Sequence, residues 1–194
     1  MIMTLLIVGL ILFLGMHSVY MLAPSVRLQL ISKLGPQGWK GLYALIALVG
    51  FVLLVLGYAD ARASTTLVWL PPSGMAHLTA LLTLVAFIFL IATYIPGSKL
   101  KAKVGHPMLL ATKIWALAHL VSNGTLVAMI LFASFLIWAV AGFAVSRRKD
   151  RAEGVQRVGY WSRDAITVVI ALVGYWLFAF HLHELLIGVK PFGM

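Results

Sequence analysis

The sequence contains no cysteine, which excludes disulfides, cysteine-ligated zinc, iron–sulfur clusters and catalysis by a thiol. Acidic residues are also scarce, because 5 Asp and Glu stand against 15 Lys and Arg in 194 residues. None of the five lies in the middle of an apolar run, where an ion-driven transporter normally keeps a carboxylate. This argues against an ion-driven transporter and leaves a passive channel open. Charged residues make up 10% of the chain, whereas soluble domains have about 25%.

Apolar residues make up 62% of the sequence, and the mean hydropathy is +1.04. A helix needs about 20 apolar residues to cross the hydrocarbon core of a bilayer. The sequence therefore predicts an all-α integral membrane bundle that forms a single transmembrane domain over 1–194. About six spans are expected, of which the fourth is short, and five result if that short helix does not cross. The expected spans are 2–23, 41–58, 75–95, 107–121, 125–145 and 164–187.

Most basic residues lie in the three segments that connect spans one and two, three and four, and five and six. In a soluble protein the net charge of +10 would suggest nucleic-acid binding, but here the pattern is that of membrane topology. Short cytoplasmic loops carry an excess of Lys and Arg, so these three segments are expected in the cytoplasm and both termini on the other side. With six spans, the connecting segments alternate between basic and less basic ones, as this topology requires, and with five spans they do not. The residues are Arg27, Lys33, Lys40, Lys99, Lys101, Lys103, Arg147, Arg148, Lys149, Arg151, Arg157 and Arg163.

Two histidines, His17 and His119, lie inside predicted spans. An imidazole in lipid must satisfy a donor and an acceptor, which makes each a candidate for function or for a hydrogen bond between helices. Cores of helical bundles hold haem or metal ions between histidines of facing helices. Zinc would require further ligands, and no carboxylate is expected at that depth. Haem needs one or two axial ligands and an apolar pocket, so the composition favours haem.

The neighbours of these histidines define a candidate cofactor site. Gly9, Phe13 and Tyr20 share a helix face with His17, and the glycine is expected to leave room there for a flat cofactor. Trp115 shares a face with His119, with Ala116 beside it. Taken alone, such a stripe is more often ordinary helix packing. By helical rise, His17 lies about 9 Å from the expected cytoplasmic end of the first span, and His119 lies about 18 Å from that of the fourth. Two axial ligands of one iron should lie at more similar depths.

Three further histidines lie toward the opposite membrane side, at the far ends of spans three and six. They are His77, His181 and His183, with Glu184 on the same face as His181. A surface metal site and an interfacial polar cluster are the two alternatives for this end of the protein.

Several stretches resemble the NnrU family, and the similarity runs over nearly the whole chain. The most specific stretch combines HPML at 106–109 with KIWALAHLVSNG at 113–124. NnrU proteins are bacterial membrane proteins associated with denitrification, and the family is similar to the haem-dependent zeta-carotene isomerase. The resemblance implies haem b with axial ligands at His17 and His119, and His106 matches a further histidine of the shared pattern. Shorter matching stretches are GMHS at 15–18, WKGLY at 39–43 and LIGVKP at 186–191.

One difference from the isomerase bears on activity. The isomerase has a cysteine three residues before the second axial histidine, where this chain has Ala116. Exchange between cysteine and histidine at the iron is therefore impossible, which argues against carotene isomerisation but not against haem binding.

The residues favour a six-span membrane protein that binds haem, and the resemblance implies haem b, the bacterial inner membrane and an association with nitrite and nitric oxide metabolism. The haem could sense or process nitric oxide, transfer electrons or isomerise a lipid-soluble polyene, and the sequence does not choose among them or decide whether the protein is an enzyme. Membrane lipid, haem and respiratory or denitrification proteins are the expected partners. The alternative is a cofactor-free accessory or assembly protein of a respiratory complex.

Overall fold

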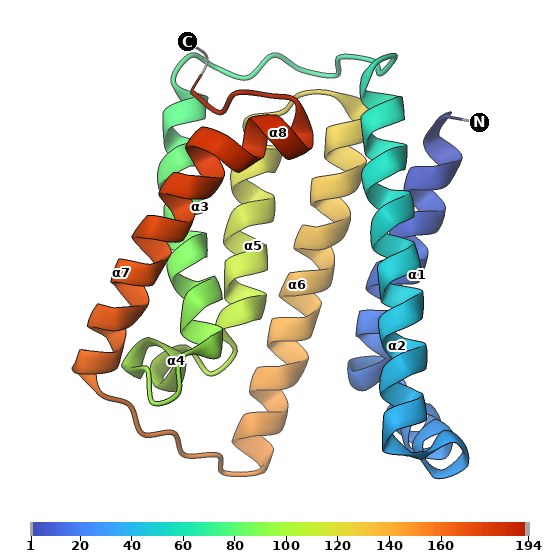
Figure 1. The fold of residues 1–194 in the computed structure, drawn as a ribbon, viewed down its shortest axis with the longest axis vertical. Helices are drawn as coiled ribbons and strands as arrows, with labels where there is room; N and C mark the ends of the chain where they lie inside the picture. The colour runs from blue at the N-terminus through green and yellow to red at the C-terminus, as the bar shows by residue number, and fades with distance from the viewer. Residues whose placement is uncertain (1, 193–194) are drawn as a thin grey trace. The chain divides into compact units, whose positions relative to one another are not determined.

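The structure is a computed structural model that describes residues 2–192, and it is almost entirely helical (Figure 1). Five of its helical stretches are long and apolar enough to cross a membrane, so the chain is a multi-pass membrane protein. Within residues 2–192 only two isolated bridges between extended residues occur and no strand forms. The elements are α1 (Ile2–Leu22), α2 (Pro24–Arg62), α3 (Met75–Tyr94), α4 (Lys99–Val104), α5 (Pro107–Leu120), α6 (Leu126–Ala152), α7 (Trp161–Leu177), the π-helical η1 (Phe178–Leu182) and α8 (His183–Ile187).

The chain folds into two compact units. The first unit contains α1, α2 and the beginning of α6, up to Ser134. The second contains α3, α4, α5, the rest of α6 from Phe135, and α7 to α8. The expectation of a single transmembrane domain stays a prediction.

In the first unit, α1 and α2 pack against each other in antiparallel orientation through glycines. Gly9 of α1 lies against the backbone of Leu54, and Gly50 of α2 lies against Phe13, where an added Cβ would be 2.7 Å from the backbone nitrogen. Gly57 contacts the backbone of Leu6 in the same way. Small residues let the backbones of membrane helices approach closely, so these glycines fix the register of the pair.

In the second unit, α5 and α7 both pack against α3 in antiparallel orientation (Figure 1). The Thr79 hydroxyl, near the start of α3, donates to the carbonyl of Ala118 near the end of α5 at 2.9 Å. The Tyr175 hydroxyl of α7 donates to the carbonyl of Ala80 at 3.0 Å. The helix α5 has 14 residues, too few to count among the five long helices. It nevertheless returns the chain along α3, as expected if six spans alternate in direction.

Two helices extend beyond their expected spans. The helix α2 begins at Pro24 instead of residue 41 and is broken at Gly35, whose φ of 71° is left-handed. The helix α6 continues to Ala152 instead of ending at 145. The α2 extension contains Arg, Lys and Gln among its leucines, and the α6 extension contains Arg and Lys. These charged and amide side chains lower the hydropathy, but they are good helix formers.

Two shorter elements were not expected from the sequence. The helix α4 forms in the segment between the third and fourth runs, and Ser98 caps it by accepting a hydrogen bond from the backbone nitrogen of Lys101. The last run passes from α-helix to π-helix after Leu177 and then into α8.

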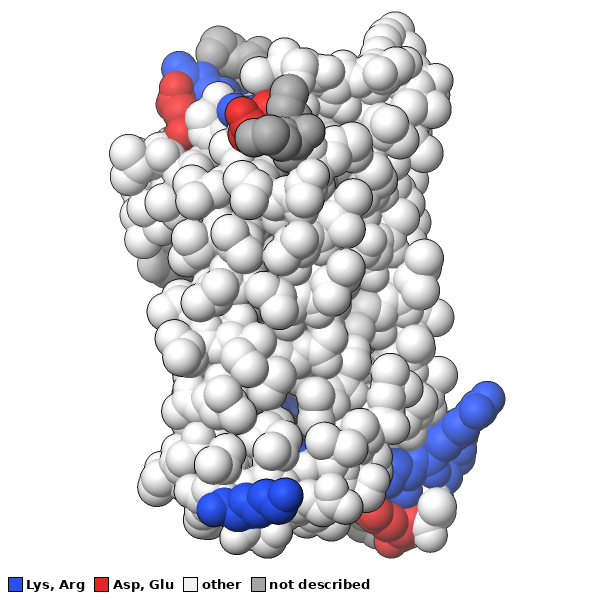
Figure 2. Space-filling view, turned by 90° about the vertical axis from the view of Figure 1, so that its right-hand side faces the viewer, with Lys and Arg blue, Asp and Glu red and all other residues white. Residues whose placement is uncertain are grey.

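Most charged residues lie toward the ends of the helices, and Lys113 in the middle of α5 is an exception, with its ammonium 4.6 Å from the ring centre of Phe143. On the face shown in Figure 2, Lys, Arg, Asp and Glu gather toward the two ends, and uncharged residues cover most of the length between them. This distribution is the one a lipid bilayer requires, because a charged side chain is costly in hydrocarbon.

Candidate functional site

His17 lies on α1, where α2 packs against it. Its Nδ1 is 2.7 Å from the carbonyl oxygen of Phe13, one helical turn earlier. The ring centres of Phe13 and His17 are 4.3 Å apart. The ring centre of Tyr43 from α2 is 5.4 Å from that of His17, in an edge-to-face arrangement. His17 is therefore held by its own helix and flanked by aromatic rings.

His119 lies near the end of α5 in the same kind of surroundings. Its Nδ1 is 2.9 Å from the carbonyl oxygen of Trp115, and the two rings are 5.3 Å apart. Trp115 in turn contacts Phe135 of α6, edge to face at 5.5 Å. Ala116, beside this face of α5, is fully buried.

Both histidines thus follow one arrangement, in which an aromatic residue four positions earlier supplies both a carbonyl and a ring. A carbonyl oxygen only accepts hydrogen bonds, so the hydrogen of the neutral imidazole is on Nδ1 and the lone pair is on Nε2. Histidines that bind metals usually donate their other N–H to a carbonyl or a carboxylate, which sets the tautomer and orients the ring. The chemistry of each side chain therefore fits an axial ligand that binds through Nε2.

The donors present fit haem better than a metal ion held by several side chains. Among the residues that the structure describes, no group of three or more His, Asp or Glu lies close enough to hold a metal ion. Haem iron requires only one or two protein ligands. Imidazole and aromatic rings in an apolar helix are suitable neighbours for a porphyrin.

Two sequence-based interpretations concern α1: the one for Gly9 is wrong, and the one for Tyr20 is not tested. We expected Gly9 to leave room for a flat cofactor on the face of His17, but the backbone of Leu54 fills that space. Tyr20, expected to contact the cofactor, is 55% exposed, and the Arg27 guanidinium lies 6.0 Å from its ring centre. A cofactor contact of Tyr20 stays a prediction.

The sequence VSNG after His119 closes the end of α5. The Asn123 side chain donates to the carbonyl of His119 at 2.8 Å, and the Ser122 hydroxyl donates to that of Ala118 at 3.1 Å. Gly124 lies against the backbone of Trp69, where any Cβ would collide. The motif therefore satisfies carbonyls that the helix end leaves without partners and fixes the turn that carries His119.

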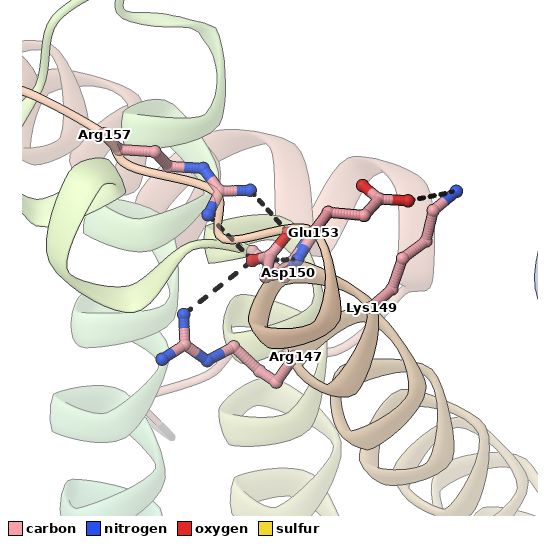
Figure 3. Close-up of polar contacts among 6 residues, drawn as sticks. Arg147, Lys149, Asp150, Glu153 and Arg157 are labelled. Carbon is pink, nitrogen blue, oxygen red and sulfur yellow. Dashed lines mark hydrogen bonds and ion pairs between the residues drawn. The ribbon is translucent and has the colours of Figure 1, made fainter.

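His106 lies at the other end of α5, in an ionic cluster that the sequence did not indicate (Figure 3). Its Nε2 is 2.9 Å from Oδ2 of Asp150 near the end of α6. Arg157 donates to both oxygens of Asp150, at 2.7 and 2.9 Å, and Arg147 lies 3.8 Å away. The cluster joins three segments of the second unit: the start of α5, the end of α6 and the following loop.

His106 cannot bind the same iron as His119. The two are 13 positions apart on one helix, about 20 Å by helical rise. The structure gives His106 a carboxylate partner, and its expected contact with the cofactor stays a prediction.

The ionic cluster lowers the pKa of Asp150 from 3.8 to about 2, mainly because Arg157 donates hydrogen bonds to the carboxylate, with His106 acting in the same direction. The pKa is lower in the folded state, so the stabilisation is complete above about pH 4 and is lost as the pH falls through about 2. Neutral pH thus retains the full contribution.

Asp150→Asn is expected to destabilise the second unit by about 1–3 kcal/mol, because two arginines and His106 lose a charged acceptor. Limited trypsin digestion should cut the 151–157 segment faster than in the unmodified protein. Glu153→Gln is the matched control, because the Lys149–Glu153 pair at 3.9 Å is exposed on both sides and contributes little (Figure 3). Equal digestion of both variants would show that the cluster does not hold the loop.

His181, His183 and Glu184, in the last helical stretch, make local contacts and are called here the far-end polar cluster. His183 Nδ1 is 2.7 Å from the carbonyl oxygen of Val189, and Glu184 pairs with Lys190 at 3.7 Å. The ring of His181 contacts Trp176 at 5.0 Å. Over residues 2–192 no metal-ligand group includes these side chains, which favours the polar alternative over the metal site.

Comparison with known proteins gives one match. A family model described as NnrU protein matches residues 5–191, which is nearly the whole chain. No curated protein and no solved structure matches.

Proposed function

This chain belongs to the NnrU family, membrane proteins associated with denitrification, and we propose that it is a haem b protein of the bacterial cytoplasmic membrane with axial ligands from His17 and His119. The observation that carries the proposal is the shared arrangement of these two residues. Each imidazole donates from Nδ1 to the carbonyl of an aromatic residue one turn earlier, at 2.7 and 2.9 Å. Each is thereby oriented with its lone pair on Nε2.

The residues around the two histidines have distinct tasks in this proposal. Phe13 and Trp115 orient the imidazoles and keep water from them, and Asn123 holds the end of α5. Bound haem would supply an iron that exchanges electrons or binds a diatomic gas such as nitric oxide. If both axial positions are occupied, a substrate reaches the iron only when one histidine leaves, so a stable pair favours electron transfer or a structural role.

Ligation of one iron by both histidines sets a geometric condition. His17 is five residues from the end of α1, about 8 Å, and His119 is twelve residues from the start of α5, about 18 Å. The cytoplasmic ends of α1 and α5 must then be offset by about 10 Å along the membrane normal, or tilted to the same effect. Without such an offset, one histidine alone would bind the iron.

A visible spectrum of the protein purified in mild detergent, oxidised and dithionite-reduced, tests the proposal. A Soret band with sharp reduced α and β bands is expected for six-coordinate low-spin haem with two histidines. A Soret band without sharp α and β bands would indicate one axial histidine and an open iron position. A colourless protein, after expression with a haem precursor, would overturn haem binding and favour the cofactor-free accessory protein.

A further inference from the structure

We propose that residues 24–34 form an interfacial helix that lies in the anionic headgroup region of the cytoplasmic leaflet, as a lipid-binding surface separate from the histidine sites. The segment is the first part of α2, before the break at Gly35. Figure 1 shows this part turned away from the axis of the remainder of α2. Gly35 makes the turn with a φ of 71° and a ψ of 166°, and Pro36 begins the next helix.

The length of the segment excludes a membrane crossing. Eleven helical residues extend about 16 Å, which is half of the hydrocarbon thickness. The part of α2 after Gly35 ends at Arg62 and extends about 40 Å, so it crosses without help from residues 24–34. The segment begins directly after α1 ends at Leu22, which places it at the cytoplasmic membrane surface.

The side chains of the segment divide into an apolar and a polar face. Leu30, Ile31 and Leu34 lie on one side of the helix, and Ser25, Gln29 and Ser32 lie on the opposite side. Leu30 and Ile31 are partly buried. Other apolar side chains of the segment are exposed: Val26 is 47%, Leu28 61% and Leu34 48% exposed. The apolar face of the segment is therefore only partly covered by protein.

Charge identifies the lipid as anionic. Between residues 24 and 41 the sequence has three cations, Arg27, Lys33 and Lys40, and no acidic residue. Arg27 lies on the apolar side of the helix, and its guanidinium is 6.0 Å from the ring centre of Tyr20. A guanidinium and an exposed tyrosine at this level match the phosphate and glycerol region of a lipid leaflet. Lys and Arg next to a membrane span attract anionic lipid.

Site-directed spin labelling in proteoliposomes tests this assignment. The chain has no cysteine, so Leu34→Cys and Gln29→Cys each introduce a single labelling site. In vesicles of phosphatidylglycerol and phosphatidylcholine, the ratio of collisions with oxygen to collisions with a water-soluble nickel chelate should be several-fold higher at position 34 than at position 29. Ile11→Cys, on the lipid-exposed face of α1, and Glu153→Cys, in the cytoplasmic loop, give the lipid and water references.

Each outcome decides one part of the proposal. If the collision ratios at positions 34 and 29 were both close to the water reference, the interfacial location would be overturned. If both ratios were close to the lipid reference, the polar outer face would be overturned. In phosphatidylcholine alone, and in the Arg27→Gln/Lys33→Gln variant, the label at position 34 should lie less deep. An unchanged depth in both cases would overturn the role of anionic lipid.

Discussion

His119→Ala is expected to lose most of the haem of the purified protein while the chain still inserts into the membrane. The substitution removes an axial ligand, whereas the backbone of α5 keeps the cap from Asn123 and Ser122. The haem-to-protein ratio, measured from the pyridine haemochrome spectrum, gives the loss directly. His17→Ala is expected to act in the same direction, because the two histidines have equivalent local arrangements.

The control for this experiment is His181→Ala, whose ring contacts Trp176 in the far-end polar cluster. It removes an imidazole from a membrane helix without touching either proposed ligand, so its haem content should stay unchanged. His119→Met keeps the volume of the side chain and should retain haem with a higher reduction potential, because methionine with histidine raises it. Unchanged haem content in His119→Ala would remove His119 as a ligand.

Gly57→Ala is expected to destabilise the first unit by about 2–3 kcal/mol, which is a large effect for one methyl group. Its Cβ would meet backbone atoms of α1, including the Cα of Leu6 at 2.8 Å, and backbone cannot move aside as a flexible side chain can. The two helices would have to separate along a contact that Gly9 and Gly50 continue. Thermal unfolding in detergent, followed by circular dichroism, measures the change.

Gly15→Ala, in the same unit, is expected to leave the stability unchanged or to raise it, in contrast to Gly57→Ala. Gly15 is exposed on α1 and a Cβ there would meet nothing within 4 Å. Alanine favours a helix by up to about 1 kcal/mol over glycine, so this variant should unfold at the same or a higher temperature. If both variants shifted the unfolding temperature equally, close packing of α1 against α2 through Gly57 would be contradicted.

The helices that the sequence predicted well have both an apolar run and a residue that ends it. The span expected at 75–95 is α3, Met75–Tyr94, which follows Gly74 and stops before Pro96-Gly97. The short helix expected at 107–121 is α5, with Pro107 in its first turn. Hydropathy and proline give reliable helix boundaries when they coincide, and both helices form with nearly the expected bounds, whereas a membrane crossing by α5 stays a prediction.

The features that the sequence did not indicate depend on tertiary contacts or on helix formation without hydropathy. His106 and Asp150 are 44 positions apart, and only the packing of the second unit brings the two side chains together. The helix before Gly35 was missed because Arg27 and Lys33 interrupt its apolar residues. The local surroundings of His17 and His119 followed from spacing, because an aromatic residue four positions earlier lies one turn away.

The π-helical turn at Phe178–Leu182 changes how side chains near the end of the chain should be compared with relatives. Such a turn accommodates one extra residue within a helix, so every side chain after it is rotated by about 100° from its place in a continuous α-helix. The α-helical spacing that put His181 and Glu184 on one face therefore does not hold across this turn. A relative with an uninterrupted helix would be one residue shorter at this point, and a single-residue gap within 178–182 is where we expect chain lengths to differ.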